Sequence, residues 1–159
     1  MVEAASIGWR PGGTIVVLTQ KTTLIHGPYA IDKWEAVFEI HAGALLEDLH
    51  SFIQNTLAFD DDHPYGFFIA RTENSRERQT FDDENGGLSL YDTSIGNLYP
   101  LPDKRHLYYL FDYGDNWLFK ITKTTKTALE PIPDVEYPRL MRESGTRPSQ
   151  YPSEDEDAA

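Results

Sequence analysis

The sequence predicts a single α+β domain, with one main helix packed on one face of a mixed or mainly antiparallel sheet of four to six strands. Three observations support this: a length of 159 residues, an alternating apolar pattern over residues 34–40 and an apolar stripe over residues 44–57. Domains usually span roughly 100–200 residues, so the length fits one domain. We expect a flexible N-terminus over residues 1–13, the domain over 14–127, and a Pro-rich acidic tail, extended or disordered, over 128–159.

The clearest strand runs from Trp34 to Ile40, where Trp34, Ala36, Phe38 and Ile40 alternate with a mostly charged set. Successive side chains of a strand point to opposite faces, so this pattern predicts a half-buried antiparallel strand. Further β-branched, aromatic or alternating segments predict more strands. They are residues 14–18, 21–25 and 65–71, and the hairpin formed by 107–113 and 117–122.

The predicted helix spans about Ala44 to Leu57. Its apolar residues recur at helical spacing and form one stripe, made of Leu45, Leu46, Leu49, Phe52, Ile53 and Leu57. Gly43 precedes the helix as a tolerable cap, and Glu47 and Asp48 suit the positive end of the helix dipole. We expect the stripe to pack on the apolar face of the sheet.

The charge and composition exclude several classes of protein. The formal net charge is −12, which opposes direct nucleic-acid binding because an acidic surface repels phosphates. No apolar stretch reaches the roughly 20 residues of a membrane span, and the N-terminus lacks the regions of a signal peptide. The chain has no cysteine, which excludes disulfides and thiolate zinc sites. We expect a cytoplasmic protein without membrane partners.

Several short segments occur together in a distinctive order. They are Leu49-His50, Asp62-His63 with Phe67, the run Asp112-Tyr113-Gly114-Asp115-Asn116-Trp117, and Tyr137-Pro138 followed by Gly145, Pro148 and Gln150-Tyr151-Pro152. Over about residues 34–152 this pattern resembles the plasmid pRiA ORF-three-like family, also named for TnpR-type passenger proteins of insertion sequences. The Asp-aromatic-Gly-Asp-x-Trp hairpin is its most specific element.

The resemblance implies an α+β domain with a helix on a mixed or antiparallel sheet, and a setting on plasmids, transposons and bacterial genomes. It implies no established enzymatic activity, and no serine- or tyrosine-recombinase signature is present. The chain departs from the family twice. Glu35-Ala36 follows Trp34 where many relatives have an arginine pair, and Gln150-Tyr151-Pro152 replaces a Pro-Pro-Glu-Asp-type segment.

Four residues form a candidate metal site: His50, His63, Asp112 and Asp115. Two imidazoles and two carboxylates suit zinc or another divalent ion and leave a position for a water that attacks a phosphoester or amide. The alternative is structural, and we favour it. Asp residues beside Gly114 commonly bond turn amides, His50 can bond a strand end, and Trp117 is most simply a core residue with its N–H satisfied.

Three functional hypotheses follow, and the first is favoured. The first is a non-enzymatic module without a cofactor that binds another protein, through an aromatic edge at Tyr108, Tyr109 and Tyr113 or through the long polar loop 72–106. The second is a metal-dependent hydrolase or nuclease that uses the His/Asp cluster. The third is an acidic DNA mimic whose charges, including Asp82, Asp83 and Glu84, form a linear stripe.

Overall fold

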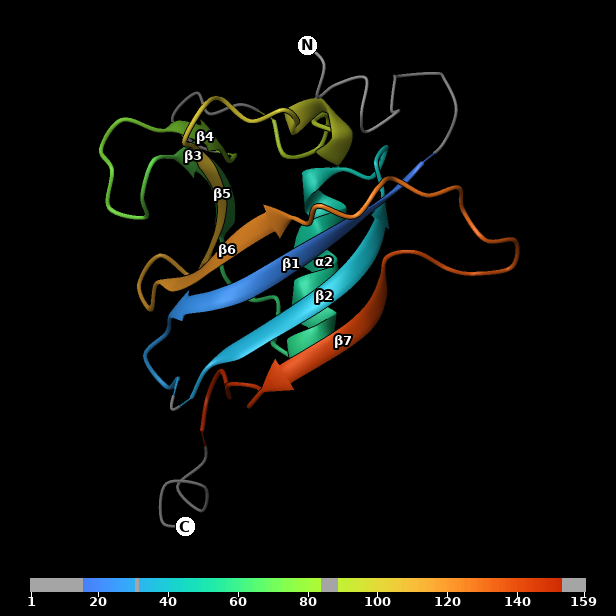
Figure 1. Cartoon of the computed structure of the whole chain (residues 1–159). Coiled ribbons are helices and arrows are strands. Elements are labelled where there is room, and N and C mark those ends of the chain that lie inside the picture. Colours follow the sequence, from blue (N-terminus) through green and yellow to red (C-terminus); the bar gives the residue numbers. More distant parts are fainter. Residues whose placement is uncertain (1–15, 31, 84–88, 153–159) are drawn as a thin grey trace.

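The computed structural model describes residues 16–30, 32–83 and 89–152, which form one seven-stranded antiparallel sheet and one α-helix, α2 (Leu46–Leu57). The strand order is β4-β3-β5-β6-β1-β2-β7 (Figure 1). The strands are β1 (Val17–His26), β2 (Trp34–His41), β3 (Tyr65–Ala70), β4 (Gln79–Phe81), β5 (His106–Phe111), β6 (Trp117–Lys123) and β7 (Arg139–Gly145). The α+β class and the antiparallel sheet are confirmed, but the sheet has more strands than the four to six predicted.

The extra strands lie where the sequence predicted irregular chain. Strand β4 lies in the predicted loop 72–106, which also contains the 3-10 helix η1 (Ile95–Leu98). Strand β7 lies in the predicted tail and pairs with β2, from Trp34 opposite Gly145 to Glu39 opposite Arg139. A disordered tail is therefore wrong for β7, whose exposed edge position tolerates a polar sequence without alternation. Residues 1–13 and 154–157 lie outside the described residues.

Strand β1 is one continuous element where two short strands were predicted. The break was placed near Thr19 and Gln20 because polar residues interrupt the apolar run. Gln20 instead lies opposite Phe38 of β2, on the helix side of the sheet, and is fully buried. Its amide nitrogen donates a 2.8 Å hydrogen bond to Tyr99 Oη, and this bond helps satisfy the buried amide.

The core lies between α2 and one face of the sheet, as predicted. The helix stripe residues Leu46, Leu49, Ile53 and Leu57 are buried, and so are the apolar side chains on one face of β2, which are Trp34, Ala36, Phe38 and Ile40. The helix begins two residues later than expected: its N-cap is Leu45 rather than Gly43, and the Asp48 carboxylate accepts a 2.8 Å hydrogen bond from the Leu45 N–H. Figure 1 shows α2 behind the sheet, where it crosses β1 and β2 at an angle.

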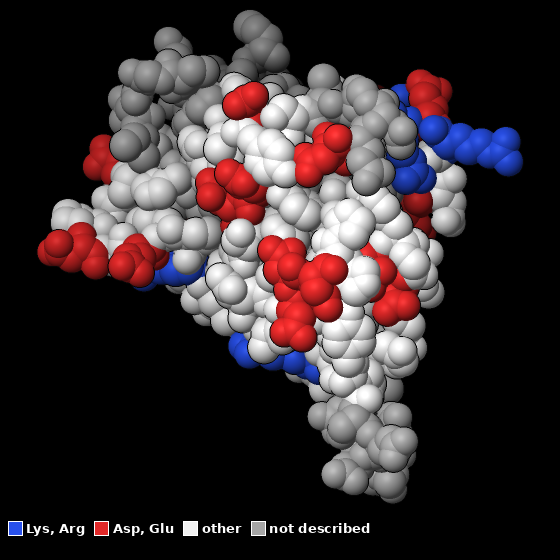
Figure 2. Space-filling model, turned by 180° about the vertical axis from the view of Figure 1, so that it is seen from behind, with Lys and Arg blue, Asp and Glu red and all other residues white. Residues whose placement is uncertain are grey.

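No described element covers the opposite face of β1, β2, β6 and β7 (Figure 1), which we call the open face. Strand β1 presents Thr19, Lys21 and Thr23 there, and neighbouring β6 presents Leu118, Lys120 and Thr122. The helix side is different: Figure 2 shows separate groups of Asp and Glu there with few Lys or Arg.

None of the described helices has the length and apolar character needed to cross a lipid bilayer.

Candidate functional site

The turn between β5 and β6 is organised by Asp112. Its Oδ1 accepts hydrogen bonds of 3.2 Å from the N–H groups of Gly114 and Asp115, as the structural interpretation predicted. The Asn116 N–H donates a 2.6 Å bond to the Asp112 carbonyl oxygen. Positive φ angles occur at Asp112 (62°) and Asn116 (57°), two residue types that tolerate this conformation better than most. Buried Asp112 is thus a structural residue of the hairpin.

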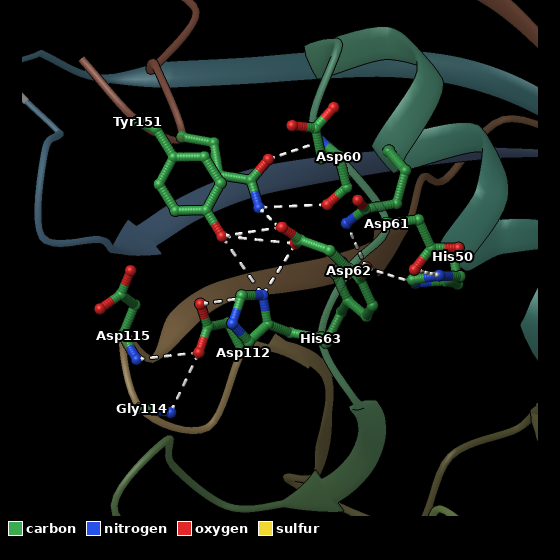
Figure 3. Close-up of polar contacts among 12 residues, drawn as sticks. His50, Asp60, Asp61, Asp62, His63, Asp112, Gly114, Asp115 and Tyr151 are labelled. Carbon is green, nitrogen blue, oxygen red and sulfur yellow. Dashed lines mark hydrogen bonds and ion pairs between the residues drawn. The ribbon is translucent and has the colours of Figure 1, made fainter. Parts of the chain in front are cut away.

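The second carboxylate oxygen of Asp112 faces His63, at the start of the segment that leads into β3 (Figure 3). His63 Nδ1 lies 3.5 Å from Asp112 Oδ2 and 2.8 Å from Asp62 Oδ1. The hydrogen bond to Asp62 raises the pKa of His63, and the charges of Asp112, Asp62 and Asp115 add to this against a smaller effect of burial. Burial alone would raise the pKa of Asp62, but hydrogen bonds from His63 and Tyr151 lower it.

The segment after β7 returns to this cluster through Gln150 and Tyr151. The Gln150 side chain is buried; its Oε1 accepts a 2.5 Å bond from the Asp60 N–H and its Nε2 donates a 3.1 Å bond to the Asp60 carbonyl oxygen. Tyr151 Oη donates a 3.1 Å bond to Asp62, and burial with this bond raises the pKa of Tyr151 to about 12. We call this contact the C-terminal clasp, made of Gln150 and Tyr151 on residues 60–63.

His50 belongs to a separate network inside the core. Because a carboxylate only accepts, His50 Nε2–H donates the 2.9 Å bond to Asp61, which leaves Nδ1 to accept a 2.6 Å bond from the Tyr109 hydroxyl. Gln54 Nε2 donates a 3.0 Å bond to the same hydroxyl. The imidazole stacks on Tyr65, with ring centroids 3.5 Å apart. Burial lowers the pKa of His50, and Asp61 opposes that effect.

The four predicted metal ligands therefore do not meet as one group. The structure brings His63 and Asp112 together and places the Asp115 amide beside them, whereas His50 turns to Tyr109 and Asp61 (Figure 3). Within the part of the chain that the structure describes, no three His, Asp or Glu residues are placed to hold a metal ion. Both nitrogens of His50 and the Nδ1 of His63 already have protein partners.

The remaining motif residues are mainly structural. Leu49, Phe67 and Trp117 are fully buried in the core, and Tyr113 is partly exposed. Contrary to expectation, Trp117 Nε1 has no hydrogen-bond partner within the described part of the chain. Gln150 and Tyr151 belong to the pattern that resembles the family, but their position beside Asp62 and His63 was not predicted from the sequence. A signal was available, because a glutamine and a tyrosine between prolines are unusual in a tail that makes no contacts.

The aromatic edge predicted as a partner surface is mostly internal: Tyr109 is fully buried and Tyr108 is 2% exposed. The same side of the sheet as the open face instead carries, over β3, β5 and β6, a hollow of about 500 Å³, which we call the apolar hollow. Phe68, Leu110 and Leu118, together with Ile25, supply its apolar side chains, and the Arg78 guanidinium lies 3.9 Å above the Phe68 ring. The other lining residues are His26, Glu73, Asn74 and Asn116.

A second hollow, of about 670 Å³, lies on the open face around the strand ends of β6, β1 and β7, and we call it the basic hollow. Its lining includes four cationic side chains, Lys21, Lys123, Lys126 and Arg142. The two hollows share no lining residue. The third hypothesis concerned other charges: Asp82 and Asp83 lie beside β4, and Glu84 lies outside the described residues.

Three features define the structural class of this domain. They are the seven-stranded antiparallel sheet with one helix, the His-Asp pair at the β5–β6 turn and the C-terminal clasp. The family described as plasmid pRiA4b ORF-3-like protein matches residues 35–155, and the chain belongs to it. The resemblance inferred from the motifs is thereby confirmed, while the TnpR-type name stays a prediction.

Among solved structures, the chain is similar to a protein of unknown function from Methanosarcina mazei Go1. The TM-score is 0.65 at 18% sequence identity, over 82% of this chain and 71% of that chain. At this identity the likeness supports the fold alone. No curated protein matches the chain.

Proposed function

We propose that the protein is a non-enzymatic binding module that holds a partner protein on the open face of its sheet. The observation that carries this proposal is the apolar hollow, where Leu110 and Leu118 are only partly buried beside the buried pair Phe68 and Tyr108. The hollow combines four apolar side chains with five polar or charged ones, and binding sites likewise combine apolar surface with polar groups that orient the ligand. The cytoplasmic location and the mobile-element setting remain part of the proposal.

The contacts of Asp112 and His50 fit a structural role for these two motif residues. Asp112 holds turn amides and His63, and His50 joins a core tyrosine to Asp61. A general base needs a nitrogen or oxygen within reach of the proton that it removes. These atoms already accept or donate in contacts that hold elements of the fold together.

The lining of the apolar hollow indicates the chemistry of the partner. The apolar side chains suit an aliphatic or aromatic residue of the partner, because burial of such a side chain drives association. Arg78 and Glu73 both line this hollow, and Lys120 pairs with Tyr108 on the same face, so two cations and one carboxylate lie next to the apolar floor. The expected occupant is a peptide segment of another protein with an apolar residue next to a carboxylate.

Selection of peptides from a random displayed library against the full chain tests the proposal. We expect the selected peptides to combine an aliphatic or aromatic residue with Asp or Glu. Their affinity for Leu118→Glu should fall about tenfold or more, because a carboxylate replaces a partly buried apolar contact. Ile132→Glu is the matched control, since Ile132 is 49% exposed and lies outside both hollows.

Two results would overturn the proposal. One is a library that yields no peptide specific for the folded chain. The other is a set of peptides that bind Leu118→Glu as tightly as the unmodified protein. Circular dichroism of each variant separates loss of the surface from loss of the fold.

A further inference from the structure

We propose that the basic hollow binds a small phosphate ester, which goes beyond the proposed protein-binding function because this hollow is separate from the apolar one. It is lined by Lys21, Lys123, Lys126 and Arg142, by Thr19, Thr122, Thr124 and Thr125, and by Val37 and Met141. Four cations thus line one concavity of a protein whose formal net charge is −12.

The register of the sheet builds this site across four strands. Arg142 of β7 lies opposite Val37 of β2, Val37 lies opposite Lys21 of β1, and Lys21 lies opposite Thr122 of β6. Thr19 is two residues from Lys21 and so points to the same face. Rigid strands therefore hold a guanidinium, an ammonium group and hydroxyls in fixed positions relative to one another. A pre-organised binding site needs functional groups that are fixed in this way.

The cations are only loosely neutralised by the protein. Lys21 Nζ is 3.8 Å from Glu35, and Lys126 Nζ is 4.0 Å from Glu39, whose carboxylate already accepts a 2.7 Å bond from Arg139. Arg142 makes no ion pair with any described residue. An incoming anion would therefore gain charge contacts without first breaking short salt bridges.

A hydroxyl at the base of the hollow gives a second, independent observation. Thr19 is 6% exposed, and its Oγ1 has no hydrogen-bond partner among the residues that the structure describes. Buried polar groups without partners are uncommon, and each one calls for an explanation. A polar ligand bound above Thr19 supplies this explanation. Small side-chain rotations would bring the Thr19 hydroxyl to the bound anion or to a water beneath it.

The chemistry of the lining selects the kind of anion. Arg and Lys with hydroxyl groups match the several acceptor oxygens of a phosphate. Val37 and Met141 offer apolar contact to an organic group attached to that phosphate. A long polyanion such as duplex DNA would extend past the hollow toward Glu35, Glu39 and the acidic remainder of the protein, where it is repelled.

Isothermal titration calorimetry of the full chain with adenosine monophosphate, inorganic phosphate and a short DNA duplex tests the proposal. Adenosine monophosphate should bind more tightly than inorganic phosphate, and Met141→Ser should reduce that difference. Arg142→Gln and Lys21→Gln should each weaken nucleotide binding about tenfold, the loss expected for a charge-assisted contact. Lys104→Gln is the charge-matched control, exposed and outside the hollow.

Four results would overturn the phosphate-ester site: no nucleotide binding at millimolar concentration, equal affinity for nucleotide and inorganic phosphate, tighter binding of the duplex, or the same loss in Lys104→Gln. Arg142→Gln should still bind the peptides selected on the apolar hollow. This last readout separates failure of the phosphate site from failure of the protein-binding proposal.

Discussion

The hydroxyl of Tyr109 in β5 donates a 2.6 Å hydrogen bond to Nδ1 of His50 in α2. Both side chains are buried, and this bond joins the middle of the sheet to its covering helix. From His50 the network continues through Nε2 to Asp61 at the surface. The family motif histidine of the helix is thus a bridge between the two layers of the domain.

Replacement of His50 by leucine should lower the free energy of unfolding by about 1–3 kcal/mol, because the buried Tyr109 hydroxyl then loses its acceptor. Stacking on Tyr65 is lost as well. Urea unfolding followed by tryptophan fluorescence measures the change. Asp61→Asn is the control: its amide oxygen still accepts from His50, so the effect should stay below about 1 kcal/mol. A greater loss in Asp61→Asn than in His50→Leu would refute the bridge.

The pKa values of the two motif histidines, His50 and His63, should lie on opposite sides of the ordinary histidine value of 6.5. Burial lowers the pKa of His50, so stability falls as the pH drops below 6.5 toward the folded-state pKa. The hydrogen bond to Asp62 raises the pKa of His63, so its stabilisation is complete below 6.5 and is lost as the pH rises through the folded-state pKa.

Imidazole proton signals in an NMR titration report the two midpoints directly. We expect the His63 midpoint above 6.5 and the His50 midpoint below it. His63→Asn should remove the alkaline loss of stability while leaving the acid loss attributed to His50. A His63 midpoint below that of His50 would contradict the assigned contacts.

The C-terminal clasp should protect the backbone of Asp60. In Gln150→Ala the Asp60 N–H loses its acceptor, so its hydrogen exchange should become about tenfold faster, or more, by NMR. Tyr151→Phe removes only the hydroxyl contacts to Asp62 and His63 and should leave Asp60 protected. If Asp60 exchanges at the same rate in Gln150→Ala as in the unmodified protein, the clasp does not form in solution.

Gly27 and Gly114 should differ in their tolerance of replacement by alanine. A Cβ at Gly27 would overlap Cε3 and Cζ3 of the buried Trp117 ring. Gly27→Ala should therefore destabilise the protein by about 1–3 kcal/mol in thermal or urea unfolding. A Cβ at Gly114 meets only Asp112 Oδ1, at 3.5 Å. Gly114→Ala should stay within about 0.5 kcal/mol of the unmodified protein, and a larger cost there than at Gly27 would be inconsistent with this packing.

Strong periodicity made part of the fold predictable from sequence. The alternation over Trp34–Ile40, the helical stripe through Leu46 and Ile53, and the hairpin formed by residues 107–113 and 117–122 all appear in the structure. Strand β7 was not predictable in this way, because an exposed edge strand needs no apolar face. Gln20 hid the continuity of β1, since a polar residue was read as a break although it is buried in the core.

The candidate site was predictable only in its residue types. Asp112 was expected to bond turn amides, and it does. The turn was attributed to Gly114, but the positive φ angles lie at Asp112 and Asn116. Spacing along the chain cannot show that His63 turns to Asp112 while His50 turns to Tyr109, because these contacts depend on the tertiary packing of separate elements.

The most direct test compares peptide binding by His63→Asn and Leu118→Glu, using peptides selected on the unmodified protein. His63 stands for the motif cluster and Leu118 for the open face. We predict that His63→Asn binds within about twofold of the unmodified protein and that Leu118→Glu loses about tenfold or more. A large loss in folded His63→Asn with full retention in Leu118→Glu would contradict the claim that the motif holds the fold while the open face binds the partner.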